Sequence, residues 1–100
     1  MLEKKLDIKQ NREGDILTCA LSGWLDPNTS PQFLEQVDIS GIKKIIVDLK
    51  DIEYVFSAGL RAFLILQKKM SEQEGTLRIV NVPPSIRSIF EYAGFESMID

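Results

Sequence analysis

One serine, Ser57, has the residue type and position expected of a modification site, because it lies where a strand-like segment gives way to a long helical pattern. Serine is a strong helix N-cap residue, since its oxygen accepts a hydrogen bond from an unpaired amide of the first helical turn. The same amides form an anion site, so a phosphate on Ser57 would also be favourably placed. The sequence therefore leaves two interpretations open, a structural cap and a phosphorylation switch.

Two charged and two aromatic residues accompany Ser57 as candidates for a binding surface. Arg61 follows by four residues on the same side of a helix, and is either a solvated arginine or a partner for a phosphate or an acidic surface. Asp26 belongs to Asp-Pro-Asn-Thr, a favourable turn sequence, so it has a structural explanation beside a binding one. Trp24 and Phe56 are either core residues or, if exposed, anchors for a partner, because aromatic residues dominate interface hot spots.

The residue types argue against an independent enzyme. The 100 residues contain no histidine, which removes hydrolase mechanisms that need an imidazole and also removes the commonest metal ligand. Neither G-x-x-x-x-G-K-[ST] nor G-x-G-x-x-G occurs, so no dedicated phosphate-cradling loop is indicated. We therefore expect no catalytic residues, no metal and no cofactor.

Charge and hydropathy limit the environment and the partners. The net charge is -3, from 12 Lys+Arg against 15 Asp+Glu, and no basic run exceeds Lys-Lys, which disfavours direct nucleic-acid binding. No apolar stretch approaches the ~20 residues that span a bilayer, and the first residues lack the apolar core of a signal peptide. The single cysteine, Cys19, allows no internal disulfide and is expected to be a small core residue. These features predict a cytoplasmic protein without membrane insertion.

The hydrophobic pattern predicts alternating strands and helices in one domain over residues 1–100. Hydrophobic residues make up 44% and charged residues 27%, which suits a single globular core. Predicted strands cover residues 2–8, 16–22, 42–49 and 77–82, predicted helices cover 31–37, 57–72 and a segment after 83–84, and 11–15 and 48–54 are predicted connections. Ser30 is expected to cap the first helix. The order β-β-α-β-α-β-α predicts an α/β fold, with a mixed, mainly parallel sheet and helices packed on it.

Several segments, in this order, resemble the signature stretches of the STAS domain family. They are GWLD at 23–26, VDL at 47–49 and YVFSAGLR at 54–61. The tail PSIRSIFEYAGF at 84–95 is similar to the last helix of that family. Each motif alone is weak, but their succession over nearly the whole chain is fairly specific.

The resemblance implies a bacterial anti-sigma factor antagonist. In the implied cycle the unphosphorylated domain binds an anti-sigma factor, which is also a serine kinase, and a separate serine phosphatase resets the domain. The phosphorylated serine of the family matches Ser57, and its aspartate near the second strand matches Asp26. The expected partner-binding residues are Trp24, Asp26, Phe56, Ala58, Gly59, Leu60 and Arg61.

One position departs from the family pattern, and one other role is open. Many family members carry aspartate directly before the phosphorylated serine, where this chain has Phe56, so a kinase would meet a different surface. STAS domains also serve in lipid-transport complexes and anion transporters. The alternative is therefore a constitutive STAS subunit of a membrane transport assembly, in which Ser57 is only a helix cap.

Overall fold

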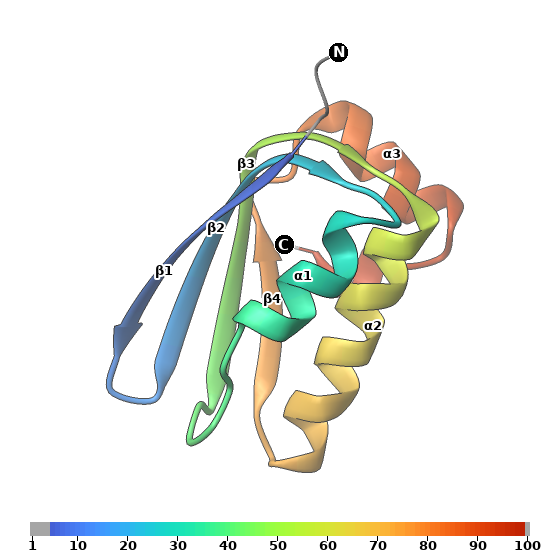
Figure 1. Cartoon of the computed structure of the whole chain (residues 1–100). Helices are drawn as coiled ribbons and strands as arrows, with labels where there is room; N and C mark the ends of the chain where they lie inside the picture. The colour runs from blue at the N-terminus through green and yellow to red at the C-terminus, as the bar shows by residue number, and fades with distance from the viewer. Residues whose placement is uncertain (1–4, 100) are drawn as a thin grey trace.

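In the computed structural model, residues 5–99 are described, and they form a sheet of four strands with three α-helices on one side of it (Figure 1). The elements are β1 (Leu6–Glu13), β2 (Ile16–Leu25), α1 (Thr29–Gln36), β3 (Lys44–Val55), α2 (Ser57–Glu72), β4 (Thr76–Val80), α3 (Pro84–Tyr92) and a 3₁₀ turn, η1 (Glu96–Met98). The strand order is β1-β2-β3-β4, antiparallel between β1 and β2 and parallel elsewhere. The predicted α/β class and mixed, mainly parallel sheet are confirmed.

One face of the sheet packs against the helices, and within residues 5–99 no helix covers the other face. On β2 burial alternates along the strand, since Leu17, Cys19 and Leu21 are buried while Thr18 and Ala20 are only half-buried. Cys19 is a core residue, as expected, and burial raises the pKa of its thiol to about 11. A thiol with a raised pKa is poorly reactive, so Cys19 contributes packing rather than chemistry.

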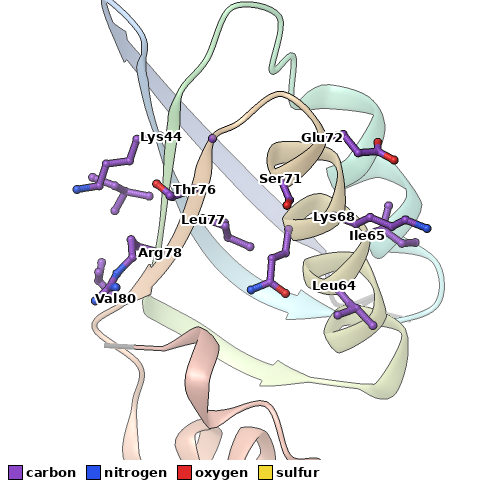
Figure 2. A pocket seen from close by; sticks show the side chains of 13 residues that line it. Lys44, Leu64, Ile65, Lys68, Ser71, Glu72, Thr76, Leu77, Arg78 and Val80 are labelled. Atoms are coloured by element: carbon purple, nitrogen blue, oxygen red, sulfur yellow. The ribbon is translucent and has the colours of Figure 1, made fainter.

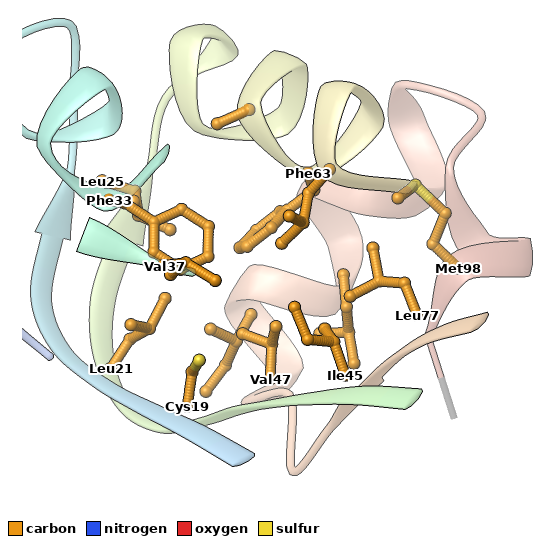
Figure 3. Packing of buried hydrophobic residues seen from close by; sticks show 14 of the residues in the cluster. Cys19, Leu21, Leu25, Phe33, Val37, Ile45, Val47, Phe63, Leu77 and Met98 are labelled. Atoms are coloured by element: carbon orange, nitrogen blue, oxygen red, sulfur yellow. The ribbon is translucent and has the colours of Figure 1, made fainter. Parts of the chain in front are cut away.

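Three phenylalanines, one from each helix, belong to the core between the helices and the sheet, and Figure 3 labels two of them, Phe33 and Phe63. Phe33, Phe63 and Phe90 are each 0% exposed. The ring centroids of Phe33 and Phe63 lie 5.8 Å apart, and those of Phe63 and Phe90 lie 5.9 Å apart. Because truncating such a residue costs about 3–5 kcal/mol, this row holds the helices firmly against the sheet.

Several predicted boundaries are wrong. β1 extends to Glu13 and pairs with β2 over its whole length, so the predicted turn at 11–15 is a tight one at Gly14 and Asp15. The start of the predicted strand 2–8 falls on residues 1–4, outside the described residues. α1 begins at Thr29 rather than at residue 31, and β4 ends at Val80, where Asn81 adopts a positive φ of 56°.

The largest difference is β3, which continues through residues 48–54 instead of ending in a connection. Its parallel pairing with β2 persists as far as Val55, although the register shifts twice along the way. At such register shifts, successive side chains no longer alternate strictly between the two faces of the sheet. The period-two pattern that marks a strand is therefore lost in this half of β3, while the backbone hydrogen bonds continue.

Candidate functional site

Ser57 is the first residue of α2, and its side chain is exposed. The N-cap is Phe56, whose carbonyl oxygen accepts hydrogen bonds from the amides of Gly59 and Leu60 at 2.9 and 3.1 Å. Among the described residues, no side chain makes a capping hydrogen bond to this helix. The interpretation of Ser57 as the cap is wrong, because strand pairing, predicted to end at residue 49, reaches Phe56: the Phe56 amide donates to the Leu25 carbonyl oxygen at 2.8 Å. The Ser57 hydroxyl is thus not used in capping.

Three aromatic side chains, Trp24, Tyr54 and Phe56, form a cluster beside Ser57, which we call the aromatic cluster. Ring centroids are 5.5 Å apart for Trp24 and Phe56, 6.3 Å for Trp24 and Tyr54, and 4.7 Å for Tyr54 and Phe56. Trp24 and Phe56 are half-buried, and Tyr54 is 42% exposed. Tyr54 is absent from the predicted site, because only the sheet register reveals that it lies opposite Trp24.

Asp26 organises the turn between β2 and α1. Its Oδ1 accepts hydrogen bonds from the amides of Asn28 and Thr29, both at 2.8 Å. The Thr29 hydroxyl accepts a bond from the Asp26 amide at 2.9 Å and donates to the Trp24 carbonyl oxygen at 2.7 Å. The hydrogen bond from the Thr29 amide, with a smaller contribution from the Asn28 amide, lowers the pKa of the Asp26 carboxyl from its ordinary value, although desolvation opposes it. Asp26 therefore has the turn role that its sequence context suggests.

The predicted capping role of Ser30 is wrong. Ser30 lies inside α1, is 3% exposed, and its hydroxyl has no hydrogen-bond partner among the described residues. The start of α1 is instead stabilised by the Asp26 side chain, which bonds the amide of Thr29 from outside the helix. A carboxylate suits this position because the free amides of a helix start carry partial positive charge.

The Asp26 turn leads to a stability prediction. Asp26→Ala should lower the free energy of unfolding by about 1 kcal/mol, because the hydrogen bonds of the turn are lost. Asp26→Asn should keep most of the stability of the wild type, because an amide oxygen also accepts hydrogen bonds. Folding lowers the pKa of Asp26. The stabilisation by its carboxylate is therefore complete at pH values above the pKa of the unfolded state, and it is lost as the pH falls through the pKa of the folded state. Urea unfolding of wild type and Asp26→Asn from pH 7 to pH 2 measures this. A constant difference between them would contradict the assignment.

The residues after Ser57 divide into packing and surface positions. A Cβ at Gly59 would lie 2.8 Å from Leu25 Cβ, so only glycine lets α2 approach β2 this closely. Leu60 is 7% exposed. These two residues therefore position the helix. Ala58 is half-buried, and Arg61 is exposed.

The surroundings of Ser57 lack two groups that commonly activate a serine hydroxyl. The chain has no histidine, and α2 has no acidic residue in its first turn, so neither an imidazole nor a first-turn carboxylate is there to activate it. Within residues 5–99 no group of three or more histidine, cysteine or acidic side chains is arranged to hold a metal ion. In the same range, no helix has the length and hydropathy to cross a membrane.

Comparison with known proteins identifies the family. The model described as the STAS domain matches residues 7–100, so the chain belongs to the STAS domain family. A putative anti-sigma factor antagonist, BtrV, from Bordetella bronchiseptica is 36% identical over 90 residues, covering 86% of this chain and 76% of that protein. The anti-sigma-B factor antagonist of Bacillus subtilis is 29% identical over 97 residues, covering 95% and 87%.

The fold also matches solved structures of one anti-sigma factor antagonist. The unphosphorylated form of SpoIIAA aligns with a TM-score of 0.85 at 16% identity, covering 94% of this chain and 86% of that one. The phosphorylated form of Bacillus SpoIIAA aligns with a TM-score of 0.76 at 16% identity, covering 94% and 89%. The homologues are thus anti-sigma factor antagonists, and this chain has the SpoIIAA fold.

Proposed function

We propose that this chain is an anti-sigma factor antagonist, which binds an anti-sigma factor while unphosphorylated and releases it when Ser57 is phosphorylated. One observation carries the proposal: the Ser57 hydroxyl is exposed, takes no part in capping α2, and follows directly on the aromatic cluster. The names of the relatives support the same role, since they are anti-sigma factor antagonists.

The binding surface consists of the aromatic cluster together with Asp26, Ala58 and Arg61. Partly exposed aromatic rings supply a large apolar area at low entropic cost when a partner covers them. Asp26 and Arg61 add one charge of each sign at the rim, where they favour a partner with the opposite arrangement. Gly59 and Leu60, which are buried, contribute by holding the start of α2 in place.

Phosphorylation acts on this surface rather than on the fold. A phosphoserine adds a charge of about -1.5 to -2. At the first position of α2 that charge is favoured by the free helical amides, and no first-turn carboxylate repels it. The phosphate would nevertheless lie beside the aromatic cluster, where a bound partner would have to desolvate it. Affinity therefore falls while stability is kept.

The chemistry of the switch belongs to the partners. The anti-sigma factor acts as the serine kinase and supplies ATP, Mg²⁺ and the catalytic groups, while this chain supplies only a hydroxyl. A serine phosphatase returns the chain to its binding form. In this scheme residues 1–100 act as one cytoplasmic binding domain, without catalytic residues, nucleic-acid contact or membrane insertion.

Incubation with the kinase-like anti-sigma factor encoded nearest this gene, in the presence of ATP and Mg²⁺, should add one phosphate per chain. Ser57→Ala should accept none, whereas Ser85→Ala, at an exposed serine in the first turn of α3, should be modified normally. Intact mass and peptide mapping measure both results. Thr29 and Ser30 are 5% and 3% exposed, so neither competes as an acceptor without local unfolding.

Two results would contradict this prediction. Phosphate mapped to Ser85 rather than to Ser57 would move the switch to another helix. Complete resistance to that kinase would instead favour a constitutive subunit of a transport assembly. In that case transporter ATPase and permease genes, rather than a kinase-like gene, should lie beside this one.

A further inference from the structure

The face of the sheet that the helices leave uncovered carries three complete rows of side chains, which we call the open face. Figure 2 shows one edge of it, where Lys44 and Val80 lie on the side of the sheet away from α2 and Leu77 points toward that helix. Paired residues on neighbouring strands share a face, so the register defines the rows. From β1 to β4 the first row is Glu13, Ile16, Lys44 and Thr76, the second is Asn11, Thr18, Ile46 and Arg78, and the third is Lys9, Ala20, Asp48 and Val80.

Apolar side chains cross the open face on three parallel strands. Ile16 on β2 is 40% exposed, and Ile46 on β3 and Val80 on β4 are half-buried, although no helix of the described residues covers them. Parallel strands are found almost only where both faces of the sheet are covered, and β2, β3 and β4 are parallel to one another. The open face is therefore the kind of surface that a partner covers.

The charges of the open face complement those of a second copy of the same face. On β3 the cation Lys44 lies in the first row and the anion Asp48 in the third, whereas on β1 the anion Glu13 lies in the first row and the cation Lys9 in the third. A rotation of half a turn about an axis along the second row exchanges the first and third rows of two facing copies. Lys44 then meets Asp48 of the other copy, and Glu13 meets Lys9, so both contacts join opposite charges.

The same rotation also matches the apolar residues by size. Ile46 lies on the axis and faces its own copy, and Ile16 faces Ala20, so a large side chain meets a small one. Arg78 lies on the same row at the edge of the sheet, and it already has an interaction within the chain. Because packed sheets cross at roughly 30°, the two copies of Arg78 are displaced to either side of the axis.

We propose that two copies of this chain pack through their open faces into a symmetric dimer, in which Lys44 pairs with Asp48 and Glu13 with Lys9 across the interface. A two-fold interface is formed by the same patch on both copies, so each of these pairs occurs twice. Three rows on four strands make a small contact, and the Kd of the dimer should lie at about 1–100 µM. The helices lie on the other side of each sheet, so both Ser57 surfaces stay exposed in the dimer. This inference goes beyond the Ser57 switch and does not depend on it.

Sedimentation equilibrium of the protein alone, from about 5 µM to about 500 µM, tests the proposal, and the wild type should change from monomer to dimer over this range. Lys44→Asp and Asp48→Lys should each weaken the dimer at least about tenfold, because each places two pairs of like charges in contact. An equimolar mixture of these two variants should return the Kd to within about threefold of wild type, since the facing charges are opposite again in the mixed dimer. Asp48→Lys also removes the hydrogen bond that Asp48 Oδ1 accepts from the Lys50 amide, so recovery in the mixture is the decisive result.

A second charge pair and two controls make the result specific. Lys9→Glu and Glu13→Lys, both at exposed positions of β1, should each weaken the dimer and should restore it when mixed. Lys69→Glu makes a similar charge change on α2, on the helix side of the sheet, so it should alter the Kd less than about twofold. Ser57→Asp should leave the dimer unchanged, which separates failure of this proposal from failure of the switch. Circular dichroism of each variant shows whether it remains folded.

Three results would overturn the proposal. A wild type that is still monomeric at about 500 µM would show that a second copy does not cover the open face. A dimer that persists in all the charge variants, or that mixing fails to restore, would place the contact elsewhere on the molecule. If the wild type is monomeric and Ile46→Glu, in the centre of the open face, abolishes binding of the anti-sigma factor while remaining folded, that protein is the occupant instead.

Discussion

Ser57→Asp should fold normally and bind the anti-sigma partner at least about tenfold more weakly than wild type, a loss of about 1.4 kcal/mol. The carboxylate occupies the first position of α2, where negative charge stabilises a helix by about 0.3–1 kcal/mol. The same charge directly follows Phe56, a member of the aromatic cluster, in the chain, and it should oppose burial of that cluster against a partner. Stability and affinity should therefore move in opposite directions, which a folding defect cannot produce. Urea unfolding and calorimetric titration measure the two quantities.

Ser57→Ala should keep both properties close to wild type. The Ser57 hydroxyl makes no capping bond, so its removal should cost less than the roughly 1 kcal/mol of a lost N-cap. Ser85→Asp is the matched control, because it places the same charge in the first turn of α3, and it should leave partner binding unchanged. The decisive comparison uses protein phosphorylated at Ser57. If it binds as tightly as the unphosphorylated form, the switch hypothesis is wrong.

Trp24→Ala and Phe56→Ala should each weaken partner binding by about 2 kcal/mol, close to thirtyfold. Each removes a ring that contacts the rest of the aromatic cluster. Both side chains are half-buried, so we also expect a modest loss of folding stability. That loss should stay well below the about 3–5 kcal/mol expected for Phe63→Ala, at a fully buried ring. Titration calorimetry and urea unfolding give the two free energies.

Tyr92→Ala is the control for these truncations, since Tyr92 is an aromatic residue that is 97% exposed at the end of α3. It should change neither affinity nor stability. A stability loss for Trp24→Ala as large as that for Phe63→Ala would show that Trp24 belongs to the core. Phe56→Leu keeps an apolar side chain at the helix start, and it should retain more affinity than Phe56→Ala. If Trp24→Ala, Phe56→Ala, Phe56→Leu and Tyr92→Ala all bind the partner equally well, the aromatic cluster is not part of the interface.

Local pattern was sufficient to predict most of the fold. The alternation of Leu17, Cys19 and Leu21 predicts which face of β2 is buried, and the structure confirms it. The predicted helix over 57–72 has the bounds of α2, because its apolar residues repeat at the helical period and face the core. Such features depend on residues close together in sequence, so no knowledge of the tertiary structure is needed.

The second half of β3 could not be predicted from local pattern. Ile52 and Val55 are buried there, but they are three residues apart, which does not match a strand. The segment is extended because β2 lies beside it, and irregular register breaks the alternation of its side chains. Backbone pairing with a distant strand thus outweighed the local signal.

The sequence by itself determined the candidate residues of the site, and the tertiary structure decided where each of them lies and what it contacts. Ser57, Asp26, Trp24, Phe56 and Arg61 stand out by residue type and spacing alone. Whether Ser57 caps α2 depended on how far β3 pairs with β2, a contact between segments about thirty residues apart in the sequence. The same register brings Tyr54 beside Trp24 and creates the aromatic cluster. Spacing along one element is local information, whereas burial and cross-strand neighbours exist only after the sheet has formed.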